Sequence, residues 1–136
     1  MIMQVPQGHP ASTAFVVDQN SGLYYSLLTM AWTVVLKESV IDDLRWFGRK
    51  DGRLLLAAAE ERLAADPAAD TRNLKTLRPN PVAQRELRVF GKYRVLFNID
   101  TEAEVVTIVL VGEKRGDALI VRGEEFTEHH EDHSSE

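Results

Sequence analysis

The hydrophobic and polar positions follow a helical period in the first half of the chain. Residues 32–36, rich in aromatic and β-branched side chains, first predict a strand. Apolar residues at helical spacing then predict two helices. The S-x-x-D signature from Ser39 to Asp42 fits the start of the first helix, Asp51 can cap the second, and Pro67 must end it at or before the preceding residue. Together they form a helical hairpin.

Large apolar side chains form a stripe along both predicted helices. They recur at the spacing that places them on one helix face, which is typical of residues that pack into a core. We therefore interpret the stripe as core and not as a ligand site. Its members are Leu44, Phe47, Leu55, Leu56 and Leu63.

After a linker rich in Pro and Asn, the period changes from 3.6 to 2, which indicates strands. The run of residues 105–111 is almost continuously apolar, as in a central strand buried on both faces. The order β-α-α-β-β-β-β predicts an α+β fold, with the helical hairpin packed on an antiparallel sheet of about four to five strands. The predicted strands of this second half are residues 84–89, 93–99, 105–111 and 118–121.

The first two of these strands form a hairpin about the turn Phe90-Gly91-Lys92. If the turn holds three residues, one face of the hairpin is apolar and suits the helices, whereas the other presents Glu86, Arg88 and Arg94. Two arginines directly opposite each other repel, so either Glu86 or a ligand phosphate must neutralise them. The register pairs Val89 with Tyr93, Arg88 with Arg94, and Leu87 with Val95.

Length and composition limit the classes of protein to consider. The 136 residues contain no Cys, which excludes disulfides, Cys-zinc sites and thiol nucleophiles. We expect one domain at residues 30–122, preceded by a loose extension or start-site artefact at residues 1–29. No basic residue precedes Lys37, so a secretory signal lacks its charged region, and polar residues interrupt the uncharged stretch that follows residue 18. The sequence therefore predicts no membrane span and a cytoplasmic location.

The net charge of −5 hides an uneven distribution. From Arg72 to Arg94, seven basic residues accompany one acid, Glu86, which gives this block a charge of +6. Residues 123–136 carry six acids and no Lys or Arg, a charge of −6. The acidity therefore belongs to the C-terminal tail, which we expect to act as an internal counterion to the sheet.

The basic block indicates an anionic partner at the sheet. The guanidinium of arginine is a planar fork that fits phosphate oxygens, so the block is typical of a surface that grips a nucleic-acid backbone. Around Arg88 and Arg94, the candidate phosphate-binding residues are Arg85, Lys92, Arg78 and Lys75.

These residues also carry a family resemblance. Over residues 32–121 the chain resembles the RelE/ParE superfamily, the toxins of type II toxin-antitoxin modules. The most specific element is the Tyr-Arg strand, followed by an apolar strand and a turn with Gly and basic residues. The matching runs are Leu77-Arg78, Arg85-Glu86-Leu87-Arg88-Val89, Tyr93-Arg94-Val95-Leu96-Phe97 and Val111-Gly112-Glu113-Lys114-Arg115.

The resemblance implies a fold of two helices on an antiparallel sheet and cleavage of mRNA in the ribosomal A site. The catalytic cations would be Arg94, Arg88, and Lys114 or Arg115. Those ribonucleases carry a tyrosine where this chain has Ile120 or Val121, so Glu86 is left as the candidate base.

Because that tyrosine is missing, two alternatives stay open. One is a ParE-like toxin that poisons DNA gyrase without cutting RNA, and the other is a non-toxic module that binds RNA or protein. A toxin of either kind implies a cognate antitoxin, and a RelE-like one also implies the ribosome and mRNA as partners. The sequence predicts no cofactor. It also predicts no metal site, since His129, His130 and His133 stand in a tail without a folded context.

Overall fold

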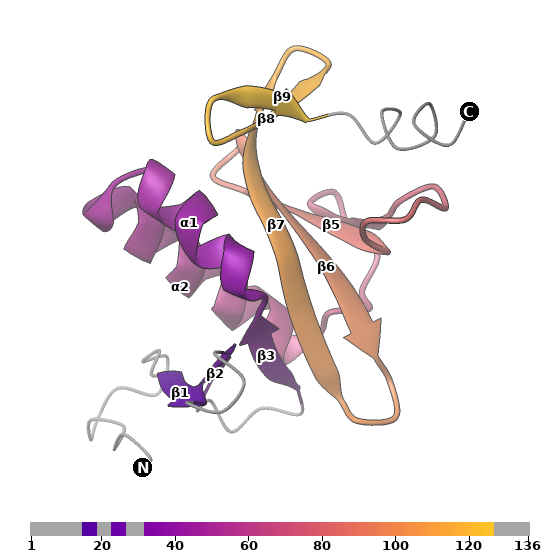
Figure 1. The fold of residues 1–136 in the computed structure, drawn as a ribbon. Helices are drawn as coiled ribbons and strands as arrows, with labels where there is room; N and C mark the ends of the chain where they lie inside the picture. The colour runs from indigo at the N-terminus through magenta and orange to yellow at the C-terminus, as the bar shows by residue number, and fades with distance from the viewer. Residues whose placement is uncertain (1–14, 19–22, 27–31, 127–136) are drawn as a thin grey trace.

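A computed structural model describes residues 15–18, 23–26 and 32–126, with side chains from residue 32 onward. The fold is α+β, with two helices covering one face of a mostly antiparallel sheet (Figure 1). The elements are β1 (Phe15–Asp18), β2 (Leu23–Ser26), β3 (Thr33–Leu36), α1 (Glu38–Trp46), α2 (Arg49–Ala65), β4 (Leu74–Thr76), β5 (Arg85–Val89), β6 (Tyr93–Asp100), β7 (Val105–Arg115), β8 (Ala118–Val121) and β9 (Glu124–Phe126).

The strands follow the order β1-β2-β3-β7-β6-β5-β4, and β8 and β9 extend from the end of β7. The central position predicted for residues 105–111 is confirmed, because β7 lies between β3 and β6. The prediction of a purely antiparallel sheet is wrong at one place, where β3 runs parallel to β7. Periodicity within a strand carries no information on the direction of its neighbour, so this pairing could not be read from the pattern.

The sheet extends beyond both ends of the predicted domain. Within residues 1–29, predicted to be a loose extension, β1 pairs with β2, and β2 pairs with the edge of β3. The predicted boundary near residue 30 and most of the acidic tail lie outside the described residues. At the other end, β9 begins just after the predicted boundary at residue 122 and pairs with β8.

The helices begin at other residues than the capping signatures predict. In α1 the N-cap is Lys37, with extended backbone and no side-chain cap, so Ser39 lies inside the helix and the predicted cap is wrong. In α2 the N-cap is Gly48 at φ 94°, and Asp51 already lies in the first turn. The tight reversal between the helices requires a left-handed residue, which Gly provides, and this turn sets the start of α2. The predicted end before Pro67 is confirmed, because α2 stops at Ala65.

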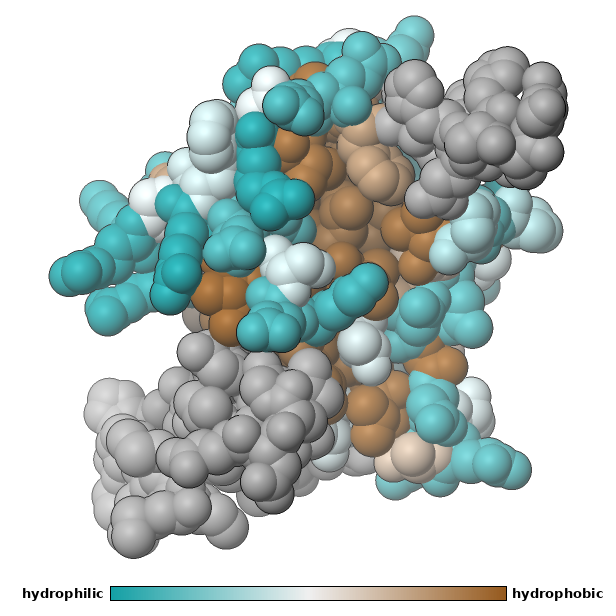
Figure 2. Space-filling model, in the orientation of Figure 1, coloured by the Kyte–Doolittle hydropathy of each residue, from teal (hydrophilic) through white to brown (hydrophobic). Residues whose placement is uncertain are grey.

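The core lies between the helices and the sheet. Leu55, Leu63, Phe97 and Ile108 are almost fully buried, and burying such side chains stabilises the fold by about 1.5–3 kcal/mol each. The predicted stripe is confirmed, with Phe47 and Leu56 packed at its margin. Hydrophilic side chains cover the helices, and hydrophobic ones gather over the middle of the sheet (Figure 2). The sheet face opposite the helices is mixed, because the register places Leu96 and Leu110 on the same side as Glu86 and Arg94.

Candidate nucleic-acid interface

The hairpin of β5 and β6 positions the candidate site. Its observed register pairs Arg88 with Arg94 and Val89 with Tyr93, as the sequence predicts. Leu87 and Val89 point toward the helices and belong to the core, so their neighbours along the strand point the other way. The two arginines therefore lie opposite each other on the sheet face that the helices do not cover.

The register extends this arrangement across three more strands. Glu86 pairs with Lys75 of β4 on one side, and Arg94 pairs with Gly112 of β7 on the other. Alternation along β7 places Lys114 on the same face as Gly112. We call this surface the basic face and define it by the cations Lys75, Arg88, Arg94 and Lys114 with the single acid Glu86.

Arg94 is the most buried cation of the basic face, with 8% of its surface exposed. Its Nη1 donates to the carbonyls of Gly91 and Tyr93, each at 3.0 Å. Burial lowers the pKa of its guanidinium, the nearby Arg88 lowers it further, and Glu86, whose Oε1 lies 4.0 Å from Nε, opposes both effects. The Arg94 side chain is therefore held in one place by the backbone, as a preorganised charge.

Arg88 is half-buried and differs from Arg94 in its partners. Its Nε is buried without a hydrogen-bond acceptor, and no ion pair engages its guanidinium within the described part of the chain. Glu86, two residues earlier on β5, lies 3.9 Å from Nζ of Lys75 and 4.0 Å from Nε of Arg94. One carboxylate thus serves two cations, and Arg88, whose buried Nε has no acceptor, would gain most from an added anion.

Two of the predicted phosphate-binding residues lie elsewhere. Arg85 points toward the helix side of β5 and is 8% exposed. Its guanidinium donates to the Asp70 carboxylate at 3.1 Å, to the Thr76 hydroxyl and to the Ala69 carbonyl, so it ties loop 66–73 to the sheet. Arg78 lies in the loop between β4 and β5, two residues beyond the end of β4. Neither residue belongs to the basic face.

The remaining predicted cations lie where the β5–β6 turn meets the end of β7. The amide of Lys114 donates to the carbonyl of Lys92 at 2.7 Å, which holds these two segments together. Glu113 lies between Lys92 and Arg115, at 3.9 and 3.4 Å respectively. Lys114 is exposed and, unlike its two basic neighbours, forms no ion pair with Glu113. Lys114 therefore forms the end of the basic face that lies beside β8.

The strand β8 lies next to the arginines. A side chain at Gly112 would approach the Ile120 carbonyl to 2.7 Å, so β8 crosses close over the position that pairs with Arg94. Ile120 and Val121 occupy the place where the resemblance implies a tyrosine, and neither can transfer a proton. Within the described residues, Glu86 is the carboxylate that contacts Arg94 on this face.

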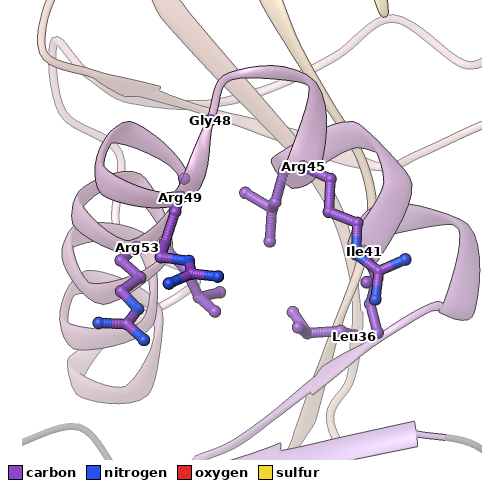
Figure 3. A pocket seen from close by; sticks show the side chains of 9 residues that line it. Leu36, Ile41, Arg45, Gly48, Arg49 and Arg53 are labelled. Carbon is purple, nitrogen blue, oxygen red and sulfur yellow. The ribbon is translucent and has the colours of Figure 1, made fainter.

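A second surface feature lies between the helices, where a cavity of about 360 Å³ opens to solvent (Figure 3). Its floor is apolar, and Arg45, Arg49 and Arg53 stand at its rim. Sequence analysis missed this cavity because Leu44 and Leu56 were assigned to the core. Arg45 lies at the end of α1, and Arg49 and Arg53 lie in the first turns of α2, so the reversal at Gly48 brings them together and no single helical period signals this cluster. The remaining lining residues are Leu36, Ile41, Gly48 and Gly52.

Among the described residues, no helix is long and apolar enough to span a bilayer, and no group of three potential metal ligands occurs. The histidines of the acidic tail lie outside those residues. Comparisons of this chain with protein-family models, curated proteins and solved structures gave no match. The functional argument therefore depends on the geometry of the site.

Proposed function

We propose that this protein is the toxin of a type II toxin-antitoxin module and stops translation by cutting ribosome-bound mRNA, in the manner of RelE. The observation that carries the proposal is the pair of opposed arginines, Arg88 and Arg94, beside a carboxylate, Glu86, that already contacts both Lys75 and Arg94. Like charges placed opposite each other destabilise a sheet. Their presence opposite each other is explained if a phosphate lies between them during function.

The proposed chemistry is attack of a ribose 2′-hydroxyl on the adjacent phosphate, which forms the O2′–P bond of a 2′,3′-cyclic phosphate and breaks the P–O5′ bond, and the departing 5′-oxygen takes a proton from water. The phosphorane that forms carries extra negative charge, which Arg88, Arg94 and Lys114 would stabilise. Arginine is too basic to take the proton from the hydroxyl. We assign that role to Glu86, which lies beside Arg94 at 4.0 Å and is still partly accessible to solvent.

Induction of the gene in bacteria, followed by mapping of mRNA ends, tests this proposal. The unaltered protein should arrest growth and produce new mRNA ends inside translated regions. Arg94→Ala and Arg88→Ala should each lower cleavage by about 100-fold, the cost of removing one preorganised charge from a transition state. Arg53→Ala, an exposed arginine on α2, is the matched control and should cut normally. Undiminished cleavage by the Arg88→Ala, Arg94→Ala double variant would disprove the proposed site.

Glu86→Gln separates catalysis from binding. The amide keeps the shape of the side chain but cannot accept the proton, so we expect cleavage to fall while ribosome association persists. If the variant cuts like the unaltered protein, Glu86 is not the base. Val121→Tyr provides the complementary test, because the side chain of Val121 lies over Gly112 on the basic face, so this variant restores there the side chain that the resemblance implies and should increase cleavage.

One observation favours a second candidate function. Since β8 supplies Ile120 and Val121 where a ribonuclease would carry its tyrosine, the fold also suits a ParE-like poison of DNA gyrase. In that case, growth arrest would come with intact mRNA, DNA breaks and co-purification of gyrase. Either toxin should be neutralised by a cognate antitoxin, so co-expression of the product of an adjacent small gene should restore growth.

A further inference from the structure

An exposed aromatic residue stands at the tip of the β5–β6 hairpin. Phe90 is 62% exposed, the largest fraction among the big apolar side chains that the structure describes. Its φ is 51°, a conformation that bulky residues rarely adopt and that Asn and Gly favour. The following residue, Gly91, also has positive φ. Both backbone strain and solvent exposure therefore disfavour Phe at this position, unless the ring contributes to function.

The ring is attached to the same turn that holds the arginines. Arg94 donates a hydrogen bond to the carbonyl of Gly91, the residue directly after Phe90. Arg88 precedes Phe90 by two residues on β5. Arg88 and Arg94 lie on the sheet face opposite Tyr93, so an RNA strand with a phosphate between the arginines would pass round the tip of the hairpin to bring a base against the Phe90 ring.

Positive charge surrounds this aromatic tip. Nζ of Lys92 lies 5.1 Å from the centre of the Tyr93 ring, and Tyr93 in turn meets Phe90 edge to face at 6.4 Å. Lys114 is bound to the Lys92 backbone. The acid at this end, Glu113, is already paired with Lys92 and Arg115. An apolar partner protein would have to bury several of these charges, whereas an anionic ligand would use them.

Aromatic rings beside cations are the means by which proteins hold single-stranded nucleic acids, because every base has a face that stacks and every nucleotide a phosphate that pairs. We infer that Phe90 stacks on an unpaired base of the RNA whose phosphate binds between Arg88 and Arg94. This inference rests on the proposed function and adds to it a contact with a base. The phosphate contacts position the strand, and the stacked base sets which nucleotide lies beside Arg94.

Phe90→Asn tests the inference without weakening the fold. Asn adopts positive φ readily, so the relief of backbone strain should offset the lost contact with Tyr93, and thermal melting should match that of the unaltered protein. Affinity for a fluorescent single-stranded RNA of about ten nucleotides should fall by about 5- to 150-fold, the effect of one lost stacking contact. Phe90→Trp should retain the affinity. Leu54→Asn, at an apolar position on α2 that is 51% exposed, is the control.

A second probe separates stacking from charge. Tripolyphosphate carries negative charge but no base, so Phe90→Asn should bind it as the unaltered protein does, whereas Arg94→Ala should bind both probes more weakly. If Phe90→Asn binds the RNA normally, or loses both probes equally, the inference is overturned and the phosphate site stands. If the unaltered protein binds neither probe, the proposed phosphate site fails with it. Binding of a partner protein that depends on Phe90, with RNA affinity unchanged, would assign the ring to a protein contact and also overturn the inference.

Discussion

The buried carboxylate of Asp43 on α1 lies 3.4 Å from the Nε of Arg122, in the turn between β8 and β9. Its other oxygen accepts a hydrogen bond of 3.0 Å from the Val111 amide of β7. Because β3 pairs with β7 only as far as Ile108, Asp43 supplies the acceptor that a further strand residue would otherwise provide. One side chain thus joins α1, β7 and the C-terminal strands.

Removal of this acceptor should destabilise the protein. Asp43→Ala leaves the buried Val111 amide without a partner, at a cost of about 1–3 kcal/mol. Asp43→Asn keeps an oxygen for that amide and removes only the charge, so its free energy of unfolding should lie closer to that of the unaltered protein. Denaturant unfolding of the three proteins checks this expectation, and equal stability of Asp43→Ala would contradict it.

The stability contributed by Asp43 should depend on pH. Burial raises the pKa of its carboxyl above 3.8 and is the largest effect, the Val111 amide and Arg122 oppose it, and the neighbouring Asp42 adds to it. The folded protein therefore binds this proton at a higher pH than the unfolded chain does. As the pH falls from neutral toward the unfolded value, the unaltered protein should gain stability relative to Asp43→Asn. Unfolding measured at several pH values tests the sign, and a relative loss at low pH would refute it.

The helical hairpin should not tolerate a methyl group at Gly52. A Cβ there would lie 2.7 Å from the carbonyl oxygen of Leu44, a backbone atom that cannot rotate away. Gly52→Ala should therefore cost about 1–3 kcal/mol, although the same change normally stabilises an exposed helix. Arg53→Ala, one residue later and exposed, serves as the control and should leave the melting temperature almost unchanged.

The basic face should become more sensitive to anions when its acid is removed. Glu86→Gln leaves Lys75 and Arg94 without their shared carboxylate, so we expect a loss of about 1–3 kcal/mol, between the effects known for exposed and buried ion pairs. Added sulfate should then raise the melting temperature of Glu86→Gln more than that of the unaltered protein. Glu61→Gln, at an exposed acid of α2, is the control. An identical response of all three proteins would show that no anion binds at this face.

The register of the β5–β6 hairpin could be predicted from the sequence, because a three-residue turn and a period of two allow few ways to pair the strands. The same alternation also places Arg85 with Leu87, on the helix side. We grouped Arg85 with the basic face by its charge alone, and strand parity would have separated it from Arg88. The burial of Arg94 could not be predicted from the sequence, because it depends on the carbonyls of Gly91 and Tyr93 and on the strands around it.

Capping motifs were poor guides to the helix starts for a different reason. Ser39 and Asp51 match short, common patterns whose stabilisation is about 1 kcal/mol each. The close packing of α1 on α2 and the sharp turn at Gly48 outweigh that amount. The first helix accordingly begins at Glu38 and the second at Arg49.

Local spacing along the chain was sufficient for the α+β class, the helical hairpin, the hairpin register and the central place of β7. These features repeat within a few residues, so the chain itself encodes them. Folding was needed to create the parallel pairing of β3 with β7, the contact of Asp43 with Arg122 and the arginine-rimmed cavity. Each of these joins segments with no common period, and they meet because burial of the core brings their elements together.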